Sequence, residues 1–196
     1  MKKVLIVVDY QYDFASKEGA LSVEGGESIY ENIDKLISDP SFDNVIYTLD
    51  THTEDKYINS EEGSMFPPHC ELNTTGWELY KIKPRHRAIS NIINDVSMEV
   101  PTDFSVEEEF VFMKDKFSIW EGNKDYESFF QSKFDKDTEI VIVGLATNYC
   151  VFMNVMGCIE RGYKNVSIMS DSIKGIKDDT YEQNINIMKN RGVVFK

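Results

Sequence analysis

Short apolar runs alternate along this chain with segments in which apolar residues recur every three or four positions. The runs are too short for a confident helix and are rich in β-branched residues, as is typical of strands buried in a parallel sheet. These predicted strands are Val4–Val8, Asn44–Leu49, Glu109–Met113, Ile140–Val143, Asn165–Met169 and Val193–Phe195.

The periodic segments between the runs predict helices with one apolar face. These predicted helices are Ser28–Ser38, with Ser28 as its cap, Arg87–Val96, Tyr126–Phe134, the segment that begins at Cys150, and Asp178–Lys189. Strands that alternate with helices in this way predict a three-layer α/β/α fold around a mostly parallel, doubly wound sheet of about six strands. We expect residues 1–196 to form one domain, because no linker or internal repeat divides the chain.

The amino-acid composition disfavours some classes of binding partner. A net charge of −13 disfavours nucleic acid and anionic membranes. Asp9 interrupts the apolar N-terminal run before it could serve as a signal peptide, and no apolar segment approaches the roughly 20 residues that span a bilayer. The three cysteines, Cys70, Cys150 and Cys158, form neither an even set nor a CxxC pair. A reducing cytoplasm is therefore expected, and formation of a homo-oligomer is left open.

Chemically capable residues follow four of the predicted strands. Asp9, Asp50, Lys114 and Cys150 stand at or near the ends of the first, second, third and fourth strand. Ligands of parallel α/β sheets collect beyond the carboxyl ends of the strands. A lysine at a strand end is often only solvated and a lone cysteine only buried, but the coincidence of an acid, a cation and a thiol at one edge favours function.

Cys150 is predicted to lie where a turn, Gly144–Asn148, passes into a helix. The first helical turn carries unpaired N–H groups and the positive end of the macrodipole, and both favour a thiolate over a thiol with its usual pKa of about 8.5. The same N–H groups can hold an oxyanion. The alternative is that Cys150 is a small buried hydrophobic residue.

A metal site is predicted on the second strand and the loop after it. Asp50 and His52 alternate along extended backbone and so point to the same side, and His69 follows a pair of prolines that stiffens the loop. Two imidazoles with nearby carboxylates suit a divalent ion, and zinc accepts this mixture of ligands. The alternative is two ordinary surface histidines.

These segments resemble a known family. The order of Asp9 in VLIVVDYQYDF, Lys114 in FMKDKFSIW and Cys150 in GLATNYCV resembles the isochorismatase-like cysteine hydrolases, which have a three-layer α/β/α fold. Within that superfamily, the D-x-H segment at Asp50 together with FPPH at 66–69 is similar to the nicotinamidases. The resemblance extends from Val4 to about Val193.

The resemblance implies a catalytic set and a reaction. Cys150 would be the nucleophile, Asp9 its general base and Lys114 the cation that stabilises the ionised pair. The reaction would convert nicotinamide to nicotinate and ammonia through a thioester, a step of NAD salvage. Backbone N–H groups of Ala146 and Cys150 would form the oxyanion hole, with a cis peptide between Ala146 and Thr147.

The choice of Lys114 over Lys116 as the catalytic cation also rests on the resemblance. Lys114 and Lys116 would point the same way from an extended backbone, so geometry does not separate them. Relatives show a lysine followed three and four residues later by an aromatic residue and a serine, here Phe117 and Ser118. This spacing favours Lys114.

The resemblance further implies how metal and substrate are held. Glu62 stands seven residues before His69, where some relatives carry a fourth metal ligand, and Glu61 is its competitor. The ion would be Zn²⁺, with Fe²⁺ or Mn²⁺ as alternatives. Phe14, Phe66 and Phe117 match positions that hold the substrate ring, although ordinary core packing also explains Phe14.

Two positions depart from the family pattern, and two other functions compete. Asn148 stands where an acidic residue is common and Trp120 where phenylalanine is usual, which bears on fine specificity. The alternatives are an isochorismatase or another amidase of the same fold, and a catalytically dead binding module. Retention of Asp9, Lys114 and Cys150 argues against the dead module, and the metal residues argue against isochorismatase.

Overall fold

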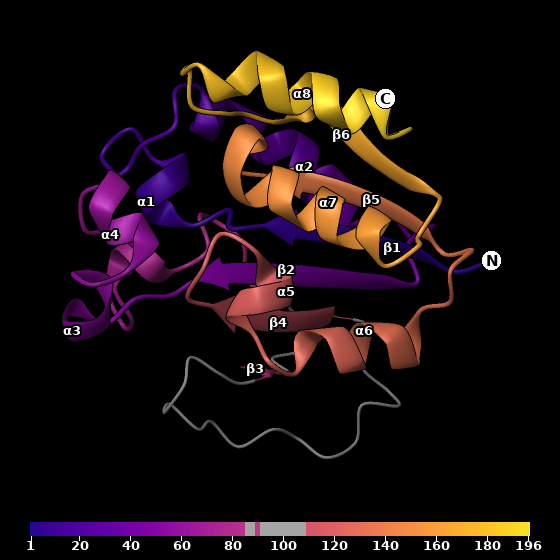
Figure 1. Ribbon diagram of the computed structural model, residues 1–196, viewed down its shortest axis with the longest axis horizontal. Helices are drawn as coiled ribbons and strands as arrows, with labels where there is room; N and C mark the ends of the chain where they lie inside the picture. The colour runs from indigo at the N-terminus through magenta and orange to yellow at the C-terminus, as the bar shows by residue number, and fades with distance from the viewer. Residues whose placement is uncertain (85–88, 91–108) are drawn as a thin grey trace.

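The chain folds around one parallel sheet. A computed structural model describes residues 1–84, 89–90 and 109–196. In the described part of the chain the sheet has seven strands in the order β3-β4-β2-β1-β5-β6-β7, and every neighbouring pair is parallel (Figure 1). The strands are β1 (Lys3–Val8), β2 (Asn44–Asp50), β3 (Ile89–Ser90), β4 (Glu109–Lys114), β5 (Glu139–Gly144), β6 (Val166–Ile173) and β7 (Val194–Phe195).

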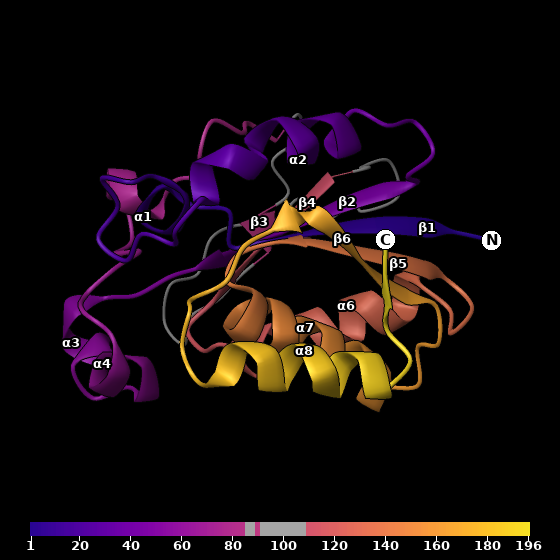
Figure 2. The ribbon, with the colours of Figure 1, turned by 90° about the horizontal axis from the view of Figure 1, so that it is seen from above.

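Helices cover both faces of the sheet, so the predicted three-layer α/β/α class is confirmed. The α-helices are α1 (Tyr12–Ala15), α2 (Tyr30–Ile37), α3 (Glu54–Tyr57), α4 (Glu61–Met65), α5 (Ile119–Gly122), α6 (Tyr126–Lys133), α7 (Phe152–Glu160) and α8 (Thr180–Asn190). Helix α2 lies on one side of the sheet and α6, α7 and α8 lie on the other (Figure 2). The described residues also include two 3₁₀ turns, η1 (Gly26–Ile29) and η2 (Thr75–Trp77), and a π-helical turn, η3 (Thr147–Val151). Within the described ranges, no helix is both long and apolar enough to cross a bilayer.

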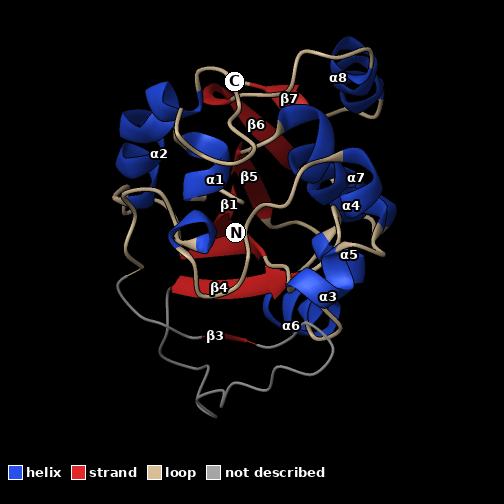
Figure 3. Ribbon diagram, turned by 90° about the vertical axis from the view of Figure 1, so that its left-hand side faces the viewer, coloured by secondary structure: helices blue, strands red, loops and turns tan. Residues whose placement is uncertain are grey.

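Strand β1 shows why helices must cover both faces of the sheet. Its side chains alternate, so Val4, Ile6 and Val8 join the core beneath α6 and α7, whereas Leu5 and Val7 join the core beneath α2. Figure 3 shows the two groups of helices on opposite sides of the strands. Because β1 lies between β2 and β5, its carboxyl end is flanked by those of both neighbours.

Several sequence predictions are corrected by the structure. Most of the helix predicted at Arg87–Val96 falls outside the described residues, and the two residues that are described, Ile89–Ser90, form β3. Within the described residues this two-residue strand joins the edge of the sheet beside β4, next to the six strands that the sequence predicts. The helix predicted from Ser28 begins with the η1 turn, and the Ser28 hydroxyl donates to the Gly25 carbonyl (2.7 Å) rather than capping α2.

Gly144 lets the chain turn sharply from β5 toward Cys150. Its φ is +113°, a left-handed region that favours glycine. A Cβ at this position would lie 2.1 Å from the Val8 carbonyl oxygen, so β1 and β5 approach each other closely where both strands end. The close approach brings the residues that follow the two strands together.

Candidate active site and metal centre

Asp9, Asp50 and Cys150 converge on the buried ammonium group of Lys114, the fourth strand-end residue. Lys114 Nζ lies 2.9 Å from Asp9 Oδ2, 3.0 Å from Asp50 Oδ1 and 3.5 Å from Cys150 Sγ. Lys114 and Asp50 are also register partners across the β2–β4 pair. All four residues are buried. The structure thus brings together the acid, the cation and the thiol that the sequence placed on separate strands.

Lys114 and Lys116 are separated by the end of the strand. Strand β4 ends at Lys114 and the chain then bends, so Lys116 is exposed whereas Lys114 is fully buried. Burial lowers the pKa of Lys114, but the charges of Asp50 and Asp9 outweigh it and raise that pKa well above its usual value. The two carboxylates thus favour the charged form of Lys114.

Asp9 is held by the neighbouring strand. The Thr48 hydroxyl donates to Asp9 Oδ1 (2.5 Å), and the Asp9 N–H donates to the Thr48 carbonyl (3.1 Å). Burial raises the pKa of Asp9, and the charge of Lys114 acts in the opposite direction. A carboxylate with a raised pKa is a stronger base than an exposed aspartate. Thr48 was missed because a threonine within a strand carries no distinguishing signal.

Cys150 lies in a π-helical turn rather than in the first turn of a regular α-helix. The Val151 N–H donates to the Ala146 carbonyl at 3.2 Å, an i to i+5 bond, and α7 begins directly afterwards. Burial raises the pKa of the Cys150 thiol and the charge of Lys114 acts in the opposite direction, so the burial of the sulfur opposes the effect that the helix start was expected to have. The cis peptide joins Leu145 to Ala146, one residue earlier than the resemblance implies.

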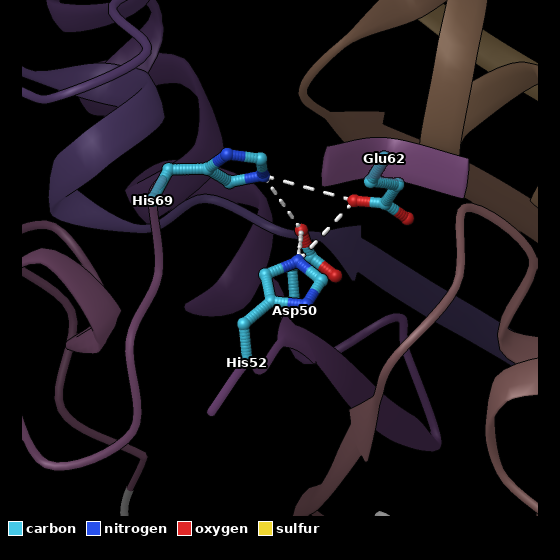
Figure 4. Close-up of side chains that lie close together, drawn as sticks. All are labelled: Asp50, His52, Glu62 and His69. Carbon is cyan, nitrogen blue, oxygen red and sulfur yellow. Dashed lines mark hydrogen bonds and ion pairs between the residues drawn. The ribbon is translucent and has the colours of Figure 1, made fainter. Parts of the chain in front are cut away.

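Next to this cluster, four buried side chains point at one another. Donor atoms of Asp50, His52, Glu62 and His69 all lie within 4.8 Å of one another (Figure 4). His52 Nε2 is 3.0 Å from Asp50 Oδ2 and 3.3 Å from Glu62 Oε2. His69 Nε2 is 3.2 Å and 3.7 Å from the same two oxygens. Glu62 is buried on α4, whereas its competitor Glu61 is exposed.

This side-chain set fits a divalent cation. Two imidazole nitrogens and two carboxylates form a mixed N/O donor set, and Glu62 Oε1 is buried without a hydrogen-bond partner. Burial lowers the pKa of His52 and His69, but the hydrogen bonds that the two rings donate to Asp50 and Glu62, together with the charges of these carboxylates, outweigh it and raise both pKa values to about 9. Because a ligating histidine is neutral, an ion entering this set displaces protons.

Asp50 belongs to both groups. Its Oδ1 contacts Lys114, whereas its Oδ2 contacts the two histidines. Gln11 fixes its backbone on both sides, because Gln11 Oε1 accepts from the Asp50 N–H (2.7 Å) and Gln11 Nε2 donates to the Asp50 carbonyl (2.8 Å). Sequence analysis missed this role of Gln11, although it lies in the quoted segment VLIVVDYQYDF.

An aromatic cavity opens onto the thiol. Its wall includes Asp50, Glu62, His69, Ala146 and Cys150, together with Phe14, Phe66, Phe117, Tyr149, Leu21, Val23 and Ile176. The three phenylalanines named from the sequence therefore face one cavity. Tyr149 was missed, although its ring lies 5.2 Å from that of Phe66 and 5.6 Å from that of Phe117.

The two departures from the family pattern lie outside the cavity wall. The Asn148 amide donates to Asp178 Oδ1 (3.0 Å) and its oxygen accepts from the Ile176 N–H (3.0 Å). An acidic residue at 148 would face Asp178, which explains an amide here. Trp120 packs in the core, where its indole N–H donates to the Asn154 carbonyl of α7 (3.3 Å). It thus supports the helix that follows Cys150.

The chain is similar in sequence and fold to known proteins. The isochorismatase domain model matches residues 97–195. The nicotinamidase of Saccharomyces cerevisiae is 30% identical over 203 residues, which cover 90% of this chain and 90% of the yeast protein. The crystal structure of nicotinamidase PncA from Bacillus subtilis covers 100% of this chain and 99% of its own at 26% identity, with a TM-score of 0.77. The pyrazinamidase of Pyrococcus horikoshii in complex with zinc, also 26% identical, has a TM-score of 0.74 over 100% of this chain and 99% of its own.

Fold and site together define an α/β/α protein with a buried thiol, ammonium and carboxylate beside a mixed N/O ligand set. With the similarity to the yeast protein over nine-tenths of the chain, the protein belongs to the isochorismatase family.

Proposed function

We propose that this protein is a metal-dependent cysteine amidohydrolase that converts nicotinamide to nicotinate and ammonia. The observation that carries the proposal is the position of Lys114 Nζ within 3.5 Å of Cys150 Sγ and within 3.0 Å of Asp50 Oδ1, which joins a nucleophile to a metal-ligand set. Two relatives named nicotinamidases and a zinc-bound pyrazinamidase support both the reaction class and the ion.

In the first half-reaction Asp9 takes the thiol proton as Cys150 Sγ attacks the amide carbonyl carbon. The carbonyl electron pair moves to oxygen, where backbone N–H groups of Ala146 and Cys150 would stabilise the charge. Asp9 then returns the proton to the amide nitrogen, the C–N bond breaks, and ammonia leaves from a thioester. Amide nitrogen departs poorly without this proton.

In the second half-reaction Asp9 takes a proton from water, whose oxygen attacks the thioester carbonyl. The C–S bond breaks, the sulfur regains a proton from Asp9, and nicotinate is released. Throughout, Lys114 offsets the negative charge that builds between Asp9 and Cys150, because its ammonium lies against both. Because burial raises the pKa of the Cys150 thiol, transfer of the thiol proton to Asp9 assists the attack by sulfur.

In this proposal the aromatic side chains of the cavity hold the pyridine ring of nicotinamide. Phe14, Phe66 and Phe117 supply apolar surface around a flat heterocycle. Asp50, His52, Glu62 and His69 would hold a divalent ion, which when bound supplies a ligand position for the ring nitrogen and so fixes the carboxamide near the thiol. Zinc suits this donor set, and so do Fe²⁺ and Mn²⁺.

The test is ammonia release from nicotinamide by Zn²⁺-loaded protein, with isochorismate assayed in parallel and Cys150→Ala as the blank. We expect ammonia from nicotinamide and no turnover of isochorismate. Turnover of isochorismate alone would replace the proposal with an isochorismatase. Binding of nicotinamide without ammonia release would make the protein a binding module.

A separate prediction concerns the fourth metal ligand. Glu62→Ala removes a buried carboxylate from the donor set and should lower the retention of Zn²⁺ by at least about tenfold, while raising the nicotinamide concentration needed for half-maximal rate. Glu61→Ala is the matched control, because Glu61 is the exposed neighbour on the same helix. Metal content after mild chelation measures both. Equal metal in wild type and Glu62→Ala would remove Glu62 from the ligand set.

A further inference from the structure

A tyrosine lies directly behind the metal-ligand set. Tyr57 ends α3 and is only 5% exposed. Its ring packs edge-on against both histidines, with centroid distances of 4.7 Å to His52 and 5.4 Å to His69. A single aromatic side chain thus supports the two imidazoles that come from different segments of the chain.

The hydroxyl of Tyr57 contacts several carbonyl oxygens of the segment that carries Glu62 and His69. It lies 2.9 Å from the carbonyl oxygen of Pro67, 3.0 Å from that of Phe66 and 3.3 Å from that of Glu62. The Glu62 carbonyl belongs to α4, and the other two lie between α4 and His69. A phenol has one proton to donate, so the three oxygens share one donor and are drawn to one point.

The same hydroxyl lies 3.2 Å from His69 Nδ1, which also faces the Pro67 carbonyl at 2.8 Å. Two acceptors at Nδ1 favour a proton on that nitrogen and leave Nε2 to bind an ion. His69 Nε2 is the atom that points at Asp50 and Glu62. Tyr57 therefore helps to fix both the orientation and the tautomer of His69.

Backbone geometry fixes Tyr57 itself. Its carbonyl accepts from the Ser60 N–H (3.0 Å) and from the Ser60 hydroxyl (2.8 Å). A Cβ on Gly63 would lie 2.0 Å from that carbonyl oxygen, so α4 packs directly on the end of α3. The phenol is thus held by the same short helices that present Glu62.

We propose that Tyr57 is a positioning residue for the metal centre: its ring and hydroxyl hold His52, His69 and the Glu62 loop in the arrangement that takes a divalent cation. The inference rests on the metal dependence proposed above. It places Tyr57 outside the reacting atoms, so its contribution is to metal affinity.

The test compares Tyr57→Phe with Tyr163→Phe. Both changes remove one hydroxyl from a buried tyrosine, and the Tyr163 hydroxyl donates to the Phe134 carbonyl (3.2 Å) in the core beside α7, away from the ligand set. Zn²⁺ is titrated into each chelator-treated protein against a chromophoric chelator. Co²⁺ is added in parallel, because its visible absorption bands report ligand geometry.

We expect Tyr57→Phe to raise the Kd for Zn²⁺ by about 10- to 100-fold and to change the Co²⁺ bands, with neither effect in Tyr163→Phe. Urea unfolding before metal addition should show both variants folded. A Kd for Tyr57→Phe equal to that of wild type overturns the role of Tyr57 alone. Wild-type protein that takes up no Zn²⁺ overturns the proposed metal dependence and this role together.

If Tyr57→Phe does not fold, Tyr57→His serves as the second variant, because an imidazole retains a ring and a polar edge. A folded Tyr57→His variant with wild-type Zn²⁺ affinity and wild-type Co²⁺ bands overturns the proposal, and a raised Kd with altered bands supports it.

Discussion

Cys150→Ala should reduce ammonia release from nicotinamide by at least about 10⁴-fold while nicotinamide still binds. The change removes the sulfur that lies 3.5 Å from Lys114 Nζ and deletes little volume from the core. Turnover is measured by ammonia release, and binding by calorimetry with the Zn²⁺-loaded variant. The expected separation of binding from turnover is a property of a nucleophile and not of a packing residue.

The other two cysteines provide the controls. Cys158 lies on α7 and is fully buried in the core between that helix and the sheet, and Cys70 is buried in the core on the opposite face of the sheet. Cys158→Ala and Cys70→Ala should each keep turnover within a few-fold of wild type, with some loss of stability. Substantial ammonia release by Cys150→Ala would rule out the thioester route.

Lys114→Met should abolish turnover and also destabilise the protein strongly, whereas Lys116→Met should do neither. The Lys114 side chain is fully buried between Asp9 and Asp50, so its removal leaves two buried carboxylates without their common cation. Breaking a buried ion pair in this way costs about 3 to 5 kcal/mol. Lys116 is exposed, and exposed charges contribute little to stability.

Urea unfolding and ammonia release measured on both lysine variants check this result. If Lys116→Met were inactive and Lys114→Met active, the assignment of the cation would be reversed. A folded and fully active Lys114→Met would show that the reaction needs no ammonium beside the thiol.

The strand ends were predictable because each is marked by an abrupt change of side-chain type. In VLIVVD and EFVFMK a buried β-branched or aromatic run stops at a charged residue, and parallel pairing then places Asp9 and Lys114 at one edge. The same signal located β2 and Asp50. What it could not supply was the choice between Lys114 and Lys116, which depends on where the strand stops and the chain bends.

Other parts of the site have no recognisable pattern in the sequence. Helices α3 and α4 are four and five residues long, too short to show an apolar period, and so they were read as a polar loop. Thr48, Gln11 and Tyr57 act through hydrogen bonds to residues distant in sequence, and their own types are common in any fold. The π-helical turn at Cys150 likewise has no pattern of its own.

Strand β1 lies in the interior of the sheet, between strands that are synthesised early and strands that are synthesised late. On one side lie β2, β3 and β4, and on the other lie β5, β6 and β7. All four proposed metal ligands, Asp50 to His69, therefore leave the ribosome well before Cys150, whose position depends on β5 pairing with β1 from Lys3↔Glu139 to Val8↔Gly144. A growing chain can carry all four proposed metal ligands before it has the proposed nucleophile, so the site is complete only when the later-made strands pair with β1.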